Sequence, residues 1–368
     1  MRETLLRNKL VVFIAVAFLL VVLPGAAQYA GNFWVRIIDF ALLYTLLALG
    51  LNIVVGYAGL LDLGYIAFYA VGAYMFGLLA SPHLTDTFPM IKAIFAGGLH
   101  TPIWVVIPLG AALAAVAGAM LGAPTLKLRG DYLAIVTLGF GEIIRVFLNN
   151  LDAPVNITNG PKGLLQIDSF KIPLLNFDFG RPGELFGLEI SSVTKYYYLF
   201  LLIVVVSVVI CYRLERSRIG RAWMAIREDE VAAKAMGINT RNMKLLAFAM
   251  GASFGGVSGV LFATFQRFIS PESFALHESI MVVAMVVLGG IGHIPGVILG
   301  ALLLASLPEV LRWVSGELDL QSITGGRLDA AILRQLLIAL AMIAIMLARP
   351  RGLWPSPEHG KAAPAPAT

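Results

Sequence analysis

Apolar runs long enough to cross a lipid bilayer recur along the whole chain of 368 residues. A membrane-spanning helix needs roughly 17–25 predominantly apolar residues. With 59% hydrophobic and 13% charged residues, the composition is far from that of a soluble globular domain. The sequence therefore predicts an all-α, polytopic integral membrane protein, with one transmembrane domain over residues 10–350 and no separate soluble domain.

We expect about ten membrane-spanning segments, within a range of about eight to eleven. Two are less regular than the others: 66–80 is short, and 275–290 begins with His277 and Glu278, as a half-spanning or broken helix would. The expected segments are 10–28, 37–55, 66–80, 103–124, 132–148, 196–212, 245–265, 275–290, 295–313 and 332–348.

The distribution of basic residues predicts the orientation of these segments. If the N-terminal residues 1–9 are cytoplasmic and every segment crosses, the cytoplasmic connections hold 16 Lys and Arg and the outer connections hold 9. This bias follows the positive-inside rule and accounts for the net charge of +5 without a nucleic-acid partner. Both termini are then cytoplasmic, and the Pro/Ala-rich tail 351–368 is expected to be disordered. The first apolar run resembles a signal peptide, but an uncleaved first helix suits a chain of ten spans better.

Residues 213–244 form a charged segment between two apolar runs, with eight Lys/Arg and four Asp/Glu in 32 residues. A cytoplasmic segment of this length and charge suggests docking to a soluble partner. The alternative is an ordinary basic loop that only satisfies the positive-inside rule.

The middle of this segment has the pattern of a short surface helix. Acidic residues at 228–230 suit a helix N-terminus, and the alanines that follow favour helix and leave a smooth surface. Gly237 is a natural helix end that needs a positive φ, and Thr240 can cap the next transmembrane helix. The residues expected to contact the partner are Arg227, Glu228, Asp229, Glu230, Ala232, Ala233 and Gly237.

Glycines interrupt the apolar run 56–74 and recur at every fourth position in 251–259 and 292–300. The interruption predicts a discontinuous helix, where Asp62 either caps the break or lines a translocation path. The regular spacing predicts close helix approach, either within the chain or between subunits.

Glu142 and Arg145 are charged residues inside an expected span. Glu142 lies roughly 15 Å from the start of its segment, close to the bilayer midplane. Residues three apart share a helix face, so the two can pair. They either fix helix register as an internal ion pair or lie near the path of a zwitterionic substrate.

The outer segment 149–195 is rich in Pro, Gly, Asn and Asp and has no sustained helical period. Its short apolar stretches suggest that it folds against the membrane domain. It is either structural packing, a cover over the translocation path, or a dock for an external protein.

The sequence offers no motif for catalysis or cofactor binding. It lacks the G-x-x-x-x-G-K-[ST] motif of nucleotide sites, its five histidines have no metal-ligand spacing, and Cys211 is its single cysteine. We expect no enzyme activity, no cofactor, no metal site and no nucleotide site in this chain.

Several long motifs, in order, resemble the M-type permease subunit of bacterial branched-chain amino acid ABC importers. The core of the charged segment, 231–237, is similar to the EAA-x-x-x-G coupling loop of ABC-importer permeases. The motifs are GLNIVVGYAGLLDLGYIAFYAVGAY (50–74), LKLRGDYLAIVTLGFGEIIR (126–145), ITNGPKGL (157–164), SRIGRAWMAIREDEVAAKAMGI (217–238), ISPESFALHES (269–279), VVLGGIGHIPGVILGALLLASLPEVLR (286–312) and RPRGLWP (349–355).

The resemblance implies a multi-pass subunit of the bacterial inner membrane. Its expected partners are a homologous permease subunit, two ATP-binding cassette subunits that hydrolyse ATP, and an extracytoplasmic amino-acid-binding protein. The expected substrates are leucine, isoleucine and valine. Within ITNGPKGL, the residues expected to contact the binding protein are Thr158, Asn159, Gly160 and Gly163.

The chain departs from the wider importer pattern at Val231, where that pattern has Glu, and it lacks the later I-x-L-P. An ion-coupled secondary amino-acid transporter is the alternative function, although internal repeats and a longer relay of intramembrane charges would be expected of it. Neighbouring genes for ATPases and vanadate-sensitive uptake would discriminate between the two.

Overall fold

The computed structural model describes residues 18–29, 31–95, 99–125, 128, 130–172, 177–185 and 188–317, together with 336, 339, 340, 343, 347 and 352–354. The N-terminal segment 1–9, most of the last expected span and most of the tail lie outside the described residues.

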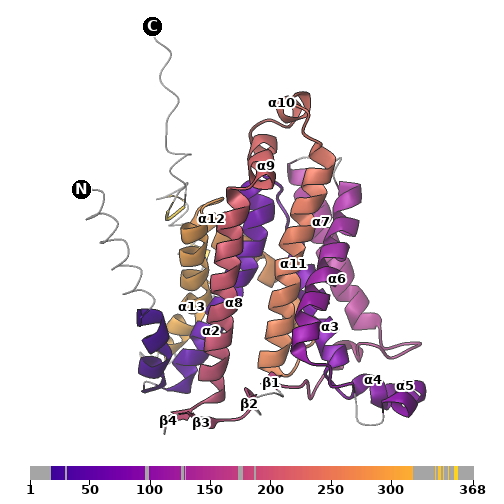
Figure 1. Ribbon diagram of the computed structural model, residues 1–368, viewed down its shortest axis with the longest axis vertical. Coiled ribbons are helices and arrows are strands. Elements are labelled where there is room, and N and C mark those ends of the chain that lie inside the picture. Colours follow the sequence, from indigo (N-terminus) through magenta and orange to yellow (C-terminus); the bar gives the residue numbers. More distant parts are fainter. Residues whose placement is uncertain are drawn as a thin grey trace.

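The described chain forms a bundle of long helices, with short helices at both ends (Figure 1). A first helix, Phe18–Tyr29, precedes α2. The long helices are α2 (Asn32–Asn52), α3 (Ile66–Leu79), α6 (Ile103–Thr125), α7 (Asp131–Asn150), α8 (Ser192–Glu215), α11 (Thr240–Gln266), α12 (Leu276–Gly289) and α13 (Ile294–Glu317). The short helices are η1 (Ile53–Tyr57), α4 (His83–Thr87), α5 (Pro89–Ile94), η2 (Gly160–Lys162), α9 (Arg218–Glu228), α10 (Glu230–Ala235) and η4 (Pro271–Phe274).

Every expected span between residues 37 and 313 coincides with a described helix. Six of these helical stretches are long and apolar enough to cross a membrane: Asn32–Tyr57, Ile103–Thr125, Ser192–Glu215, Thr240–Gln266, Pro271–Gly289 and Ile294–Trp313. Phe18–Tyr29 and α3 are shorter apolar helices, and α7 has 20 residues but carries charges. The total of about ten crossings stays a prediction.

Helix α11 packs on α2, α3 and α6 and forms the centre of the bundle. A Cβ added at Gly259 would lie 2.1 Å from the backbone oxygen of Tyr69, and one at Gly72 would lie 2.0 Å from that of Gly256. Here the regularly spaced glycines let α3 and α11 touch backbone to backbone. This confirms the prediction of close helix approach and assigns it to packing within the chain.

The interruption predicted between residues 56 and 74 is present. Helix α2 ends in the π-helical turn η1, and the chain then runs without regular helix from Ala58 until α3 begins at Ile66. The Asn52 side chain, just before η1, accepts a hydrogen bond from the Gly292 N–H, and Gly59 within the break has a φ of +69°. π-Turns of this kind often mark functional sites.

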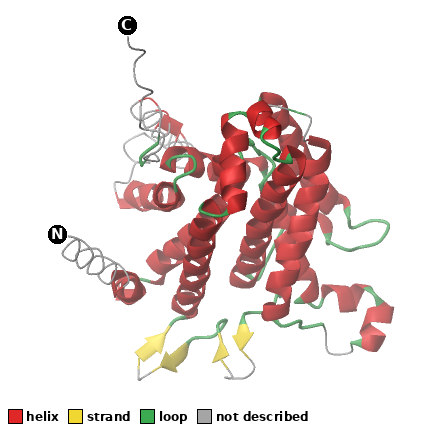
Figure 2. Ribbon diagram, turned by 45° about the horizontal axis from the view of Figure 1, so that its top comes forward, coloured by secondary structure: helices red, strands yellow, loops and turns green. Residues whose placement is uncertain are grey.

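The outer segment contains two short antiparallel hairpins, which the sequence did not predict: β1 (Lys171–Ile172) with β2 (Phe177–Asp178), and β3 (Gly183–Leu185) with β4 (Leu188–Ile190). They lie at the end of the bundle opposite α10 (Figures 1 and 2). Leu164 pairs with Ile269, and the Phe170 and Phe179 rings stack edge to face at 4.4 Å within the core. The segment therefore folds against the helices, as predicted.

We expect Gly259→Leu to lower the thermal unfolding midpoint of the protein in detergent. Overpacking a filled core costs about 1–3 kcal/mol, and here the new side chain would meet the α3 backbone. Gly139→Leu in α7 is the matched control, because a Cβ there has no heavy atom within 4 Å. Equal midpoints for the two variants would contradict the α3–α11 packing.

Candidate functional site

Helices α9 and α10 project from one end of the bundle and carry the charged segment (Figure 1). Ser217 caps α9 by accepting a hydrogen bond from the backbone N–H of Gly220. The Trp223 ring is fully buried, and its Nε1 donates to the backbone oxygen of Met243 at 2.7 Å. Helix α9 is thereby fixed to the start of α11.

The predicted short surface helix is α10, and a second helix that the sequence did not predict, α9, directly precedes it. Glu228 ends α9, and Asp229 adopts an extended conformation and caps α10 by accepting from Val231 N and Ala232 N at 2.8 and 3.0 Å. Glu230 forms an ion pair of 2.7 Å with the buried Lys244 of α11. The three acidic residues therefore have different roles: α9 ends at Glu228, Asp229 caps α10, and Glu230 anchors α10 to α11.

The exposed face of α10 differs from the expected one. Ala233, predicted to contact a partner, is only 4% exposed and faces the protein. The exposed apolar side chains are Val231 at 68% and Met236 at 83%. Gly237 has the predicted positive φ, at +84°. Asn239, and not Thr240, caps α11, because its Oδ1 accepts from the Asn242 N–H at 3.2 Å.

Arg227 points into the bundle instead of away from it. Its Nη1 donates to the backbone oxygen of Gly56 at 2.5 Å, and its side chain lies over Gly59 and close to Gly292. Partial burial lowers the pKa of the guanidinium, and nearby Glu228 opposes that shift. Arg227 thus satisfies a carbonyl that the end of η1 leaves without a helical partner.

The loop between α12 and α13 meets the same break. The backbone N–H of Gly292 donates to Asn52 Oδ1 at 2.9 Å. The C-terminal residues Leu353 and Trp354 donate backbone hydrogen bonds to Leu288 and Gly289. Two parts of the chain, distant in sequence, therefore meet at the α2–α3 break: α9 and the α12–α13 loop. Residues 352–354 pack on the far side of that loop, against Leu288, Gly289 and Gly290.

Asp62 is 1% exposed and lies within the break between η1 and α3. Both of its predicted roles, capping and lining a translocation path, stay predictions. Its Oδ1 accepts from the Gly64 N–H at 2.9 Å, and the Leu63 N–H donates to Thr137 of α7 at 3.0 Å. The second carboxylate oxygen of Asp62 is buried with no hydrogen-bond partner among the described residues. The break is therefore held to α7 as well as to α9.

Glu142 and Arg145 pair, as predicted: Arg145 Nε donates to Glu142 Oε2 at 3.0 Å. Arg145 Nη1 also lies 3.4 Å from Glu272 of η4. The side chains of Arg145 and Glu142 are 27% and 34% exposed in the isolated chain. Glu142, Arg145 and Glu272 together fix α7 to η4. Because these side chains are partly exposed, their desolvation penalty is smaller than that of a fully buried ion pair.

Comparison with known proteins decides the family. Residues 33–346 match the family model described as "Branched-chain amino acid transport system / permease component". The chain belongs to this family. The match covers every helix from α2 to α13, including the α9–α10 segment. No solved structure matches the permease.

Several curated relatives are similar over most of the permease. It is 41% identical to the high-affinity branched-chain amino acid transport system permease protein LivM of Escherichia coli K12 over 333 residues, covering 87% of this chain and 70% of the relative. It is 30% identical to BraD of Pseudomonas aeruginosa, covering 86% and 93%. It is also 27% identical to LivH of Escherichia coli K12, covering 71% and 79%.

The outer-segment residues predicted to contact a partner are mostly interior in the permease. Thr158 is 2% exposed and donates to the backbone oxygen of Leu148 at 2.7 Å. Gly160 is buried, and Gly163 lies against the backbone of Ile269. Asn159 takes a left-handed conformation and donates to the Gly163 oxygen at 2.8 Å. The motif ITNGPKGL therefore builds the turn. Its exposed positions are Pro161 and Lys162, and Leu165 directly after it is also exposed.

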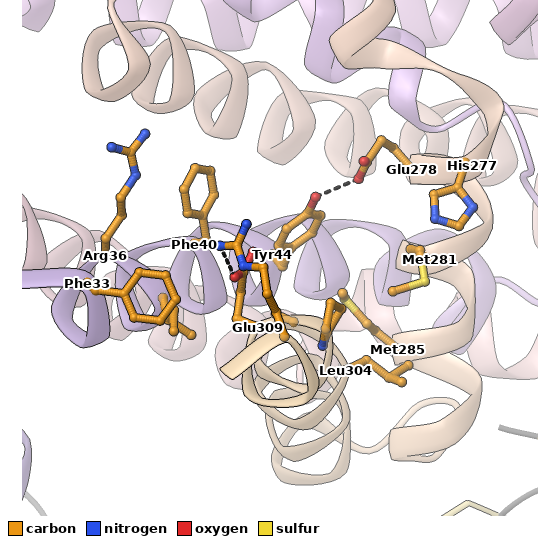
Figure 3. A pocket seen from close by; sticks show the side chains of 14 residues that line it. Phe33, Arg36, Phe40, Tyr44, His277, Glu278, Met281, Met285, Leu304 and Glu309 are labelled. Carbon is orange, nitrogen blue, oxygen red and sulfur yellow. Dashed lines mark hydrogen bonds and ion pairs between the residues drawn. The ribbon is translucent and has the colours of Figure 1, made fainter. Parts of the chain in front are cut away.

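Sequence reasoning missed two polar features of the permease. Asp39 is fully buried in α2, and neither carboxylate oxygen has a hydrogen-bond partner within the described part of the chain. Tyr44 donates to Glu278 Oε2 at 2.5 Å across 234 residues of sequence and borders a cavity between α2, α12 and α13 (Figure 3). Asp39 lies inside an expected span and could have been noticed. The contact of Tyr44 with Glu278 carries no local signal.

We expect Arg227→Met to loosen α9 in the permease. A hydrogen bond to a charged group contributes about 1.5–3 kcal/mol, so amide hydrogen exchange in α9 should be about ten- to hundredfold faster. Arg218→Met is the matched control, because Arg218 is exposed on the same helix. Unchanged exchange in Arg227→Met would show that Gly56 does not hold α9.

Proposed function

We propose that the permease translocates leucine, isoleucine and valine as one membrane-spanning subunit of an ABC importer. An extracytoplasmic binding protein delivers the amino acid, a homologous permease forms the other half of the path, and two ATPase subunits supply the energy. Family membership supports the transport role. The α9–α10 segment, anchored on α11 and on the α2–α3 break, is the observation that carries the mechanical part.

We place α9 and α10 in the cytoplasm and the hairpins on the outer side. The charged segment holds eight of the 27 Lys and Arg residues, as the positive-inside rule expects of a cytoplasmic connection. Leu353 and Trp354 pair with Leu288 and Gly289 near the same end of the bundle, which supports a cytoplasmic C-terminal tail. In this orientation α10 is available to soluble ATPase subunits.

The coupling contact in this proposal is apolar. Val231 and Met236 project from the two ends of α10 and fit a cleft on an ATPase subunit, while Ala233 packs inward. The buried Trp223 and the Glu230–Lys244 ion pair give α10 a rigid base on α11. A displacement of α10 is then carried by α9 and Arg227 to the α2–α3 break, and not absorbed by a loose loop.

The outer segment serves as the docking surface for the binding protein in this proposal. Its buried Thr158 and Gly163 hold the turn in place against α7 and against the chain that follows α11. The exposed Pro161, Lys162 and Leu165 then make the contact. The buried residues of the motif ITNGPKGL would therefore position the docking surface and not touch the partner directly.

We expect Val231→Asp to release the ATPase subunits and abolish ATP-dependent leucine uptake, because it places a charge in the centre of an apolar contact. Val155→Asp is the matched control: Val155 is also exposed, at 47%, but lies in the outer segment. The measurement is co-purification of the ATPase subunits with the tagged permease, together with uptake in proteoliposomes.

The control variant should retain the ATPase subunits at the wild-type level. Normal co-purification and uptake with Val231→Asp would contradict the assignment of α10 as the coupling helix. Loss of the permease itself from the membrane is not expected, since Val231 lies outside the helices that could cross.

A further inference from the structure

A cavity of about 350 Å³ opens between α2, α12 and α13. Ligand sites for small molecules start at about this size. The cavity lies near the outer end of the bundle, because Arg36 at its rim donates to Gln266 at the end of α11 at 2.5 Å, next to the outer segment. The cavity is therefore placed where a small solute could enter it from the outer side of the membrane.

Charges of opposite sign border the cavity at opposite ends (Figure 3). Arg36 lies at one end, and the ion pair between Arg312 and Glu309 also lines the cavity. Glu278 lies at the other end, half-buried, with one oxygen accepting from the Tyr44 hydroxyl at 2.5 Å. A molecule with a carboxylate and an ammonium group fits such a pair of ends better than a purely anionic or cationic one.

The wall between these ends is apolar. Met281 and Met285 of α12 and Leu304 of α13 line it, with the Phe40 ring of α2 facing them. Methionine side chains are flexible and polarizable, so they adapt to ligands of slightly different shape. A wall of this kind suits several short branched side chains and does not select a single one.

We propose that this cavity is a subsite for one zwitterionic amino acid on its way through the permease. The carboxylate lies toward Arg36 and Arg312, the ammonium group lies toward Glu278, and the branched side chain packs on Met281, Met285 and Leu304. The assignment rests on the proposed import function and adds to it a binding site for the substrate within this chain.

The first test fills the cavity. Ala305 lines it from α13, whereas Leu303 on the same helix is 48% exposed and does not. In proteoliposomes with the complete importer, we expect Ala305→Phe to lower leucine uptake by about tenfold or more, as steric exclusion from a pocket does. ATP hydrolysis stimulated by the binding protein should stay near the wild-type level, since α9 and α10 are untouched. Leu303→Phe should transport normally.

The outcomes separate the two proposals. If wild-type importer does not take up leucine with ATP, the proposed function itself fails. If wild type and Ala305→Phe take up leucine equally, the import function stands and the subsite is overturned.

A second measurement tests the subsite even if the Ala305→Phe variant fails to assemble. Ala305→Cys in a Cys211→Ala background leaves one reactive thiol, because Cys211 is the single cysteine. In the assembled importer with binding protein, leucine should slow alkylation of this thiol by a small maleimide, and lysine should not. If the alkylation rate is unchanged by leucine but falls when lipid is added, the cavity holds an acyl chain and the proposal is overturned.

Discussion

The α2–α3 break is the constraint on which the rest of the structure depends. A chain that leaves the helical conformation within an apolar bundle exposes backbone groups, and each unsatisfied one costs several kcal/mol in hydrocarbon. Here Arg227 satisfies the oxygen of Gly56, Asp62 accepts from Gly64, and Thr137 accepts from Leu63. The break can exist only while α9 and α7 stay in place around it.

This requirement links the two ends of the permease. Helix α2 carries the break at its C-terminal end and Tyr44 beside the cavity, and it packs on α11, α12 and α13. A shift of α9 would move Arg227, which holds the Gly56 oxygen of η1. Helix α2 is the shortest covalent connection from η1 to the cavity. The glycine contacts between α3 and α11 leave little room for either helix to move and absorb such a shift. In the proposed function, the ATPase contact and the amino-acid subsite are therefore joined by packed helices and not by a flexible linker.

Features that depend on local chemistry could be predicted from the sequence. Apolar runs located the helices, glycines located the break, and the needs of a helix end predicted the positive φ of Gly237. The spacing of Glu142 and Arg145 predicted their ion pair. Each of these signals is contained within a few residues, where propensity and periodicity apply.

Features that depend on which side of an element faces the protein could not be predicted. Helix α10 has six residues, too few for periodicity to show that Ala233 faces inward and Val231 outward. Asn239 and Thr240 are adjacent residues that can both cap a helix, and only the geometry selects Asn239. The contact between Tyr44 and Glu278 arises from tertiary packing and has no counterpart in either local sequence.

The most direct test of the account is the number of leucine molecules imported per ATP hydrolysed by the reconstituted importer carrying Arg227→Met. If α9 drives the α2–α3 break through Arg227, ATP hydrolysis continues and this ratio falls well below that of the wild type and of Arg218→Met. An unchanged ratio would contradict the claim that motion at the ATPase contact reaches the membrane through Arg227 and Gly56.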